Sequence, residues 1–313
     1  MKVMIDPGPS GNVIATIAIG EAYYHAWESC ALPTWRLYCE RHGLGLVVAD
    51  DDLIARDNPV WKKATWQKLL LADTLRRVAP AVTSVCYIDT DFLVNPWAPS
   101  IFDGYNPSRI GMVSFRHNTP YPLEAVLRRM AFLRHSQYSN SYPLDSSLFI
   151  SLERLYAFHG LPAQPDEACA GLLVFNVTHH ADVMRGWFGK YDQRIESVTG
   201  GGDQTHVNYE VQNAGLVQWL DYRFQAMWTL EMAWKYPFLY ESRWNDPALV
   251  RACVEGSLFT NYFLHFAGSW HESDMWQVAD VLGSPEVQAR FAAFQAYEQT
   301  PVTGEPVGVI KGV

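Results

Sequence analysis

Two aspartates, Asp89 and Asp91, stand one residue apart at the end of a mostly apolar run over residues 82–88. The run indicates a buried β-strand, and apolar residues resume directly after Asp91. Burying a carboxylate is costly unless it is paired or binds a metal. Two carboxylates at the end of a core strand therefore favour a divalent cation, Mg²⁺ or Mn²⁺, which would complete its shell with phosphate oxygens. The alternative is a solvated turn.

A histidine far downstream could complete the same site. His265 follows a short apolar segment and precedes Gly268, where the backbone could approach a phosphate closely. His271 could also reach a phosphate, or it could lie in a polar loop. A lone histidine is otherwise a hydrogen-bonded core residue, so the metal interpretation requires that the fold bring His265 to Asp89 and Asp91.

The stretch Tyr87–Asn95 resembles the Asp-x-Asp motif of the GT-A class of nucleotide-sugar-dependent glycosyltransferases. The chain is most similar to retaining families such as the glycogenin-like and galactosyl/xylosyltransferase groups, over roughly residues 12–272. In these families a His-Phe-x-Gly segment supplies the third metal ligand. The resemblance implies that Asp89, Asp91 and His265 hold Mn²⁺ or Mg²⁺ against a nucleoside diphosphate, with Asp89 and Thr90 beside the donor.

A second motif follows a glycine-rich stretch. Asp203 and Gln204 resemble the Asp-Gln pair that opens a helix in the retaining families. The resemblance places both at the reacting face of the sugar, where they could bind hydroxyls or stabilise an oxocarbenium-like transition state. Asp203 could equally cap the helix, because a carboxylate there accepts from free backbone N–H groups. Asp166 and Glu167 could contact the acceptor or act as a base, or be solvated loop charges.

The resemblance assigns further residues to the donor nucleotide. Thr16, Ile17 and Ala18 fall where the family's first strand holds the nucleobase with backbone groups. One acidic residue among 50–52 is expected to face the base or ribose. Gly171 opens an apolar segment that resembles the strand below the donor sugar, and a glycine there allows close approach of a ligand.

The charge that would face the diphosphate departs from the family pattern. The family often carries Lys or Arg after the glycine at 268, whereas this chain has Ser269, Trp270 and His271. Lys68, on the predicted helix before the metal-binding strand, is the alternative counter-charge. The other interpretation of Lys68 is a surface lysine.

The order of segments predicts an α/β fold, because apolar runs at 13–19, 46–49 and before Asp89 alternate with helical stretches. Further strands are predicted at 111–115, 171–177, 216–220 and 263–266, and helices at 64–78, 122–135, from about 203, 275–282 and 285–298. The resemblance specifies a GT-A-like doubly wound mixed sheet, with a Rossmann-like nucleotide-binding half and an acceptor-binding half. We expect one catalytic domain over residues 1–300 and a loose tail over 301–313.

Composition narrows the class of protein. The 313-residue chain is 49% hydrophobic and 18% charged, which suits a large packed core. Its net charge of −9 argues against nucleic acid as a general partner. Five scattered cysteines without a C-x-x-C motif indicate reduced thiols in a cytoplasmic protein. We expect no signal peptide and no transmembrane segment, so a membrane-bound acceptor would require peripheral association.

These observations predict a metal-dependent hexosyl- or pentosyltransferase. It would move a sugar from a UDP- or GDP-sugar, UDP favoured, to a hydroxyl of a saccharide or glycoconjugate in polysaccharide biosynthesis. The motifs favour retention, and an inverting enzyme with Asp166, Glu167 or Asp203 as base is the variant. A sugar-phosphate nucleotidyltransferase would need a glycine-rich basic loop after the first strand, which the sequence lacks. A non-catalytic sugar-binding module would not need His265 to meet the aspartates.

Overall fold

The computed structural model describes residues 1–138, 150–199, 202–240 and 246–267, with a few positions between 285 and 293. Gly268, His271, the tail 301–313 and the helices predicted after 275 lie outside this part or fall only partly within it. The strands are β1 Lys2–Ile5, β2 Asn12–Ile17, β3 Gly45–Ala49, β4 Ser84–Ile88, β5 Phe92–Val94, β6 Ile110–Val113, β7 Leu172–Asn176, β8 Val217–Leu220, β9 Ala226–Met227 and β10 Phe263–His265.

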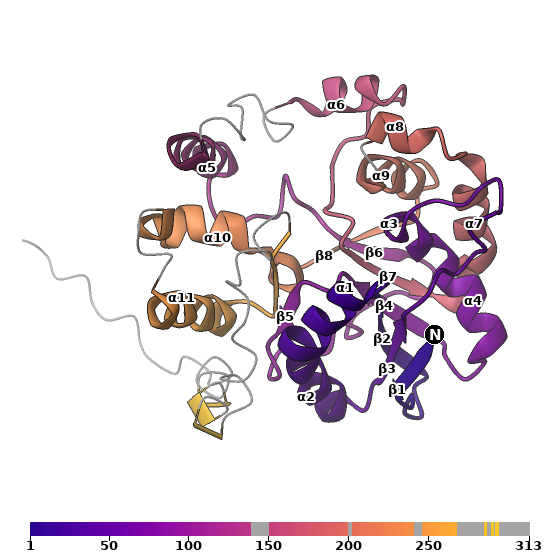
Figure 1. Cartoon of the computed structure of the whole chain (residues 1–313), viewed down its shortest axis with the longest axis horizontal. Helices are drawn as coiled ribbons and strands as arrows, with labels where there is room; N and C mark the ends of the chain where they lie inside the picture. Colours follow the sequence, from indigo (N-terminus) through magenta and orange to yellow (C-terminus); the bar gives the residue numbers. More distant parts are fainter. Residues whose placement is uncertain are drawn as a thin grey trace, which may run out of the picture.

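Helices connect most of these strands (Figure 1). The α-helices are α1 Glu21–Ala26, α2 Leu32–His42, α3 Ala64–Gln67, α4 Leu71–Val78, α5 Leu123–Tyr138, α6 Leu152–Phe158, α7 Val177–Lys190, α8 Ile195–Thr199, α9 Gln204–Asn213, α10 Trp228–Lys235 and α11 Pro247–Thr260. A π-helical turn, Trp27–Ala31, joins α1 to α2, and a 3₁₀ turn, Lys68–Leu70, joins α3 to α4. Two more 3₁₀ turns, Tyr222–Gln225 and Pro237–Tyr240, flank α10.

The main sheet has seven strands in the order β1-β3-β2-β4-β7-β6-β8. Strands β3, β2 and β4 run parallel, β7 is antiparallel to both β4 and β6, and β8 is parallel to β6. The carboxyl ends of β2, β3, β4, β6 and β8 therefore lie at one edge of the sheet. In open α/β sheets this is the edge where ligands bind.

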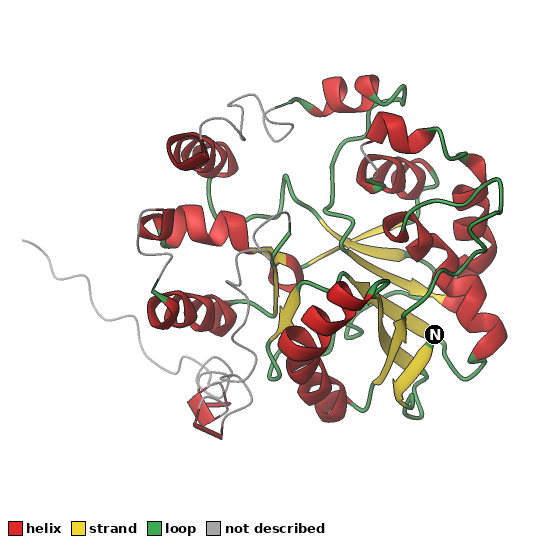
Figure 2. Cartoon of the chain, viewed as in Figure 1, coloured by secondary structure: helices red, strands yellow, loops and turns green. Residues whose placement is uncertain are grey.

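Alternate residues along each strand enter two different cores, because successive side chains point to opposite faces. In β2, Val13 and Ala15 pack with α4 and α7, whereas Ile14 packs with α2 and the small second sheet. Helices accordingly cover both faces of the sheet (Figure 2). The mixed, doubly wound α/β sheet that the sequence predicts is confirmed.

A second sheet joins segments that are distant in the sequence. β5, which follows Asp91, pairs antiparallel with β10, and β10 pairs parallel with β9. All three strands contribute to the core that contains α2 and α10. The sequence did not predict β1, β5 or β9, nor helices α6, α7, α8, α10 and α11. β5 and β9 have two or three residues each, too few to show a hydrophobic period.

All five cysteines are free thiols, and four of them are buried. Among the described residues, no helix combines the length and the apolar character needed to cross a bilayer.

Trp35 connects helix α2 to strand β5 of the small sheet through a hydrogen bond. Its fully buried indole donates a hydrogen bond from Nε1 to the carbonyl of Phe92 at 2.9 Å. We expect Trp35→Ala to lower the free energy of unfolding by about 3–5 kcal/mol, the usual cost of removing a buried tryptophan. Urea denaturation measures this cost. Trp219→Ala, at a site that is 37% exposed, is the control and should cost about 1 kcal/mol or less. Equal losses from the two changes would contradict the assignment of Trp35 as an anchor.

Candidate metal centre and adjoining pockets

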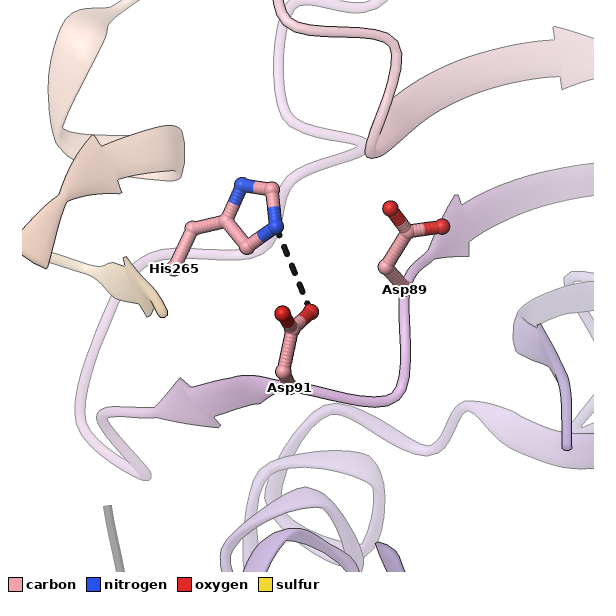
Figure 3. A group of neighbouring side chains, drawn as sticks. All are labelled: Asp89, Asp91 and His265. Carbon is pink, nitrogen blue, oxygen red and sulfur yellow. Dashed lines mark ion pairs between the residues drawn. The ribbon is translucent and has the colours of Figure 1, made fainter. Parts of the chain in front are cut away.

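Asp89, Asp91 and His265 meet at the carboxyl edge of the sheet (Figure 3). Asp89 directly follows β4, Asp91 directly precedes β5, and His265 ends β10. One ligand atom from each residue lies within 4.8 Å of the other two. His265 Nε2 lies 3.3 Å from Asp91 Oδ1. The convergence on which the sequence-based metal hypothesis depended is therefore present.

The pairing of β5 with β10 produces this convergence. His265 stands opposite Phe92 in the antiparallel register, and Phe266 donates its backbone N–H to the carbonyl of Asp91 at 2.9 Å. The Phe92 ring stacks on the imidazole, with centroids 4.1 Å apart and planes 15° apart. The imidazole is therefore held against the Asp-x-Asp turn by backbone pairing and by ring contact.

The imidazole of His265 is buried, and its surroundings favour positive charge at Nε2. Its Nε2 atom makes no hydrogen bond in the described structure, although it faces Asp91. Burial lowers the pKa of His265, but the Asp91 carboxylate and the Cys169 thiol raise the pKa by more, to about 10. The Asp91 carboxylate, which favours a proton on this buried nitrogen, would favour a divalent cation in place of that proton. Two oxygens and one imidazole nitrogen are ligands that Mn²⁺ accepts.

Gln225 orients the far side of the imidazole. Its amide nitrogen lies 3.3 Å from His265 Nδ1, while its amide oxygen is buried without a partner. The two amide atoms of a glutamine are assigned from their surroundings and are readily interchanged. With the amide turned over, the oxygen accepts from Nδ1–H, so that Nε2 is the nitrogen whose lone pair can bind a cation once its proton is displaced. Metal-bound histidines usually have such a partner.

Asp89 is fixed by three contacts. Tyr87 donates its hydroxyl to Asp89 Oδ1 at 2.5 Å, Lys68 Nζ lies 3.9 Å from the same oxygen, and the backbone N–H of Asp89 donates to Gly171 O at 2.9 Å. Gly171 has no side chain, which leaves the space that His265 and Asp89 occupy. A Cβ at position 171 would stand 2.5 Å from His265 Cε1 and 2.9 Å from Asp89 Oδ2.

Lys68 is buried beneath the metal centre, so its interpretation as a surface lysine is wrong. Its ammonium donates to Ala170 O at 2.7 Å and lies 3.2 Å from Asp203 Oδ2. Asp203 stands at the N-terminus of α9 but makes no side-chain capping bond, and pairs with Lys68 instead. Burial raises the pKa of Asp203 to about 6 although Lys68 opposes the rise. Lys68 thus joins Asp203 to Asp89.

One pocket, of about 410 Å³, opens on the Asp-x-Asp side of the metal centre. We call it the first pocket. Of the predicted donor residues, Ile17, Asp89 and Thr90 line it, whereas Thr16 and Ala18 are buried in or beside β2. Among the three acidic residues after β3, Asp52 lines the pocket. The full lining is Ile17, Ile19, Tyr23, Asp52, Arg56, Trp61, Lys63, Ala64, Thr65, Tyr87, Asp89, Thr90 and Asp91.

A second pocket, of about 360 Å³, lies on the other side, where Cys169, Met227 and Ala267 adjoin His265. Gln204 lines this second pocket and donates to Glu167 Oε1 at 2.8 Å, and Arg116 pairs with Glu167 Oε2 at 3.1 Å. Asp166 does not line the pocket. Its carboxylate lies 3.0 Å from His117 Nδ1 and accepts from the backbone N–H of Glu167.

The sequence did not predict several residues that line or support the site. Tyr87 stands in the motif itself, and its hydroxyl could have been suspected from that position. Gln225, Arg56, Trp61 and Arg116 carry no recognisable pattern, because their places in the site follow from loop conformation.

No family model matches the chain, and no curated protein matches its sequence. Many solved structures share part of its arrangement, three glycosyltransferases among them. A glycosyltransferase involved in glycosylation of the major capsid of PBCV-1 is 10% identical, with a TM-score of 0.45, over 86% of this chain and 99% of that one. The bifunctional glycosyltransferase WbbM, in its apo form, is 13% identical, with a TM-score of 0.46, over 93% of this chain.

This chain spans 53% of WbbM, about half its length. The galactosyltransferase LgtC, in complex with donor and acceptor sugar analogues, is 14% identical, with a TM-score of 0.44, over 95% of this chain and 98% of that one. At these TM-scores the likenesses carry no argument about chemistry.

We expect Gly171→Ala to weaken Mn²⁺ binding by about tenfold or more, because the added methyl group would displace His265 or Asp89 from the metal centre. Calorimetric titration with Mn²⁺ measures the change. Gly186→Ala on α7 is the matched control, since its Cβ would meet nothing within 4 Å. Mn²⁺ affinity that is unchanged in Gly171→Ala would show that the pocket tolerates the methyl group.

Lys68→Met should lower the free energy of unfolding by about 3–5 kcal/mol, because it leaves the buried carboxylate of Asp203 and the partly exposed one of Asp89 without their shared cation. Adding Asp203→Asn should recover part of this loss, since the second change removes one uncompensated charge. Urea denaturation of both single variants and the double variant measures the coupling. Strictly additive losses would mean that Lys68 and Asp203 do not stabilise each other.

Proposed function

We propose that the chain is a divalent-metal-dependent glycosyltransferase that uses a nucleoside-diphosphate sugar, UDP-sugar favoured, and transfers the sugar to a hydroxyl of a saccharide or glycoconjugate. The observation that carries this proposal is the convergence of Asp89, Asp91 and His265 from distant parts of the sequence. Neither a solvated Asp-x-Asp turn nor a core histidine would require it. The convergence agrees with the resemblance to retaining GT-A families.

The first pocket supports the donor side of this proposal. Its volume of about 410 Å³ lies within the range of small-molecule sites, and Asp89, Thr90 and Asp91 form one end of it. Trp61 offers an aromatic wall to a base or ribose. Lys63, which also lines the pocket, would offset part of the charge of a diphosphate, and so would Arg56, although it already pairs with Asp52 at 2.7 Å. The ammonium of Lys68, in contrast, is buried and already bonds the carbonyl of Ala170 and the carboxylate of Asp203.

Asp89, Asp91 and His265 would hold Mn²⁺ or Mg²⁺. When bound, the ion would offset the negative charge that develops on the leaving diphosphate. Lys68 keeps Asp89 and Asp203 in place through one buried ammonium. Gln225 orients the imidazole of His265. Gly171 has no side chain, so its backbone can lie against that imidazole. The second pocket, lined by Gln204 and Glu167, lies on the side where the donor sugar and the acceptor would meet.

Retention at the anomeric carbon is the favoured outcome. Each carboxylate considered as a base for inversion already has a partner: Asp203 pairs with Lys68, Glu167 with Arg116, and Asp166 with His117. Asp203 and Gln204 would instead act on the sugar, Asp203 through its charge and Gln204 through its amide. Glu167 lines the second pocket and is the residue to test if the product is inverted.

We propose that the enzyme works in the cytoplasm, because its five cysteines are free thiols. A saccharide or glycoconjugate acceptor would place it in polysaccharide biosynthesis. Action on a membrane-bound acceptor would require peripheral association. We further propose that residues 1–300 form one catalytic domain with a tail at 301–313. The two sheets share one hydrophobic core, which supports a single unit for the described part of the chain.

Asp91→Asn should abolish metal-dependent nucleotide binding, with roughly a hundredfold or greater loss of affinity for UDP or GDP in the presence of Mn²⁺. Calorimetry of the unaltered chain with Mn²⁺, and again with chelator, sets the reference. Asp103→Asn, which removes the same charge at an exposed site, is the control. Equal nucleotide affinity with and without chelator in the unaltered chain would overturn the proposed function.

A further inference from the structure

A third pocket, of about 480 Å³, lies apart from the two at the metal centre. Its walls come from the segment after β6, the segment after β8, one side of α10, and the turn between α11 and β10. It shares no lining residue with the first or the second pocket. None of the residues to which the proposed transferase function gives a role lines it.

The charges in the third pocket cancel. Two acidic and two basic side chains line it, and each acid has its base: Arg223 pairs with Asp221 at 2.8 Å and Lys235 with the buried Glu231 at 2.6 Å. A phosphate or another strongly charged ligand would have to break one of these pairs. The pocket therefore favours a neutral ligand with many hydrogen-bonding groups, for which the paired charges offer both donors and acceptors.

Trp234 supplies a flat apolar surface in the same pocket. Its ring is 37% exposed, yet it is held in position. The guanidinium of Arg129 lies 5.3 Å from the centre of the ring, and the ring of Tyr121 lies 6.2 Å away. A fixed aromatic ring beside polar groups is suited to the apolar face and the hydroxyl edge of a sugar.

The third pocket is placed to receive a long acceptor. It lies beyond the ends of β6 and β8, at the edge of the sheet that also carries Asp89. Tyr222, in its wall, accepts through its hydroxyl from the backbone N–H of Met227 at 3.2 Å, and Met227 lines the second pocket. The walls of the two pockets are thus in direct contact.

We propose that the third pocket binds neutral saccharide units of the acceptor, remote from the hydroxyl that reacts, with Trp234 as the stacking surface. The acceptor is then an oligosaccharide or polysaccharide rather than a single sugar. The acceptor role rests on the proposed transferase function, whereas binding of a saccharide at Trp234 does not.

The test is binding of neutral gluco-, galacto- and manno-oligosaccharides, two to eight units long, first on a glycan array and then by calorimetry. We expect the chain to bind at least one of them, and the longer members more tightly. Trp234→Ala should lower that affinity by about tenfold, the effect of losing one aromatic stacking contact. Trp219→Ala removes an equally exposed tryptophan outside the pocket and should leave the affinity unchanged.

Nucleotide binding separates this proposal from the transferase proposal. Trp234→Ala should keep the thermal unfolding midpoint and the Mn²⁺-dependent UDP affinity of the unaltered chain, which shows that any loss is local. If the unaltered chain binds no oligosaccharide, or if Trp234→Ala binds as well as Trp219→Ala, the third-pocket proposal is wrong. If saccharides bind at Trp234 but no nucleotide binds, the transferase proposal fails and the saccharide site stands.

Discussion

The antiparallel pairing of β5 with β10 is the constraint on which the candidate site depends. Asp89 and Asp91 come from one turn, but a third ligand must come from elsewhere, and the register of this short pair sets His265 opposite Phe92. Each strand has only three residues, so the pairing itself is weak. Its position is secured by the surrounding core, in which Trp35 binds the carbonyl of Phe92 and the Phe92 ring stacks on the imidazole.

Beneath the candidate metal centre, charged side chains are buried, which costs solvation free energy. Lys68, Asp203 and Asp89 bring one positive and two negative charges together, two of the three side chains being almost fully buried. Such a group is stable only while each member keeps its partner. Since Lys68 holds both carboxylates, it couples the strand end that carries Asp89 to the start of α9, where Gln204 enters the second pocket.

The sequence predicted those parts of the fold that have a long hydrophobic period or an abrupt polar end. Strands β2, β3, β4 and β7 are apolar runs, and Asp89 and Asp91 stand out because charge follows such a run. It could not predict that Lys68 is buried, because its partner Asp203 is distant in the chain. Nor could it choose among the acidic residues 50–52, since loop conformation decides that Asp52 lines the first pocket and Asp50 pairs with Lys2.

The late position of β10 has a consequence for biosynthesis. A chain still attached to the ribosome with residues up to 240 exposed already contains both aspartates, Lys68 and all seven strands of the main sheet, but not His265, which would complete the centre. Partly synthesised chains would then lack one of the three side chains, and the candidate centre would form only after the C-terminal part of the chain has emerged and β10 has paired with β5.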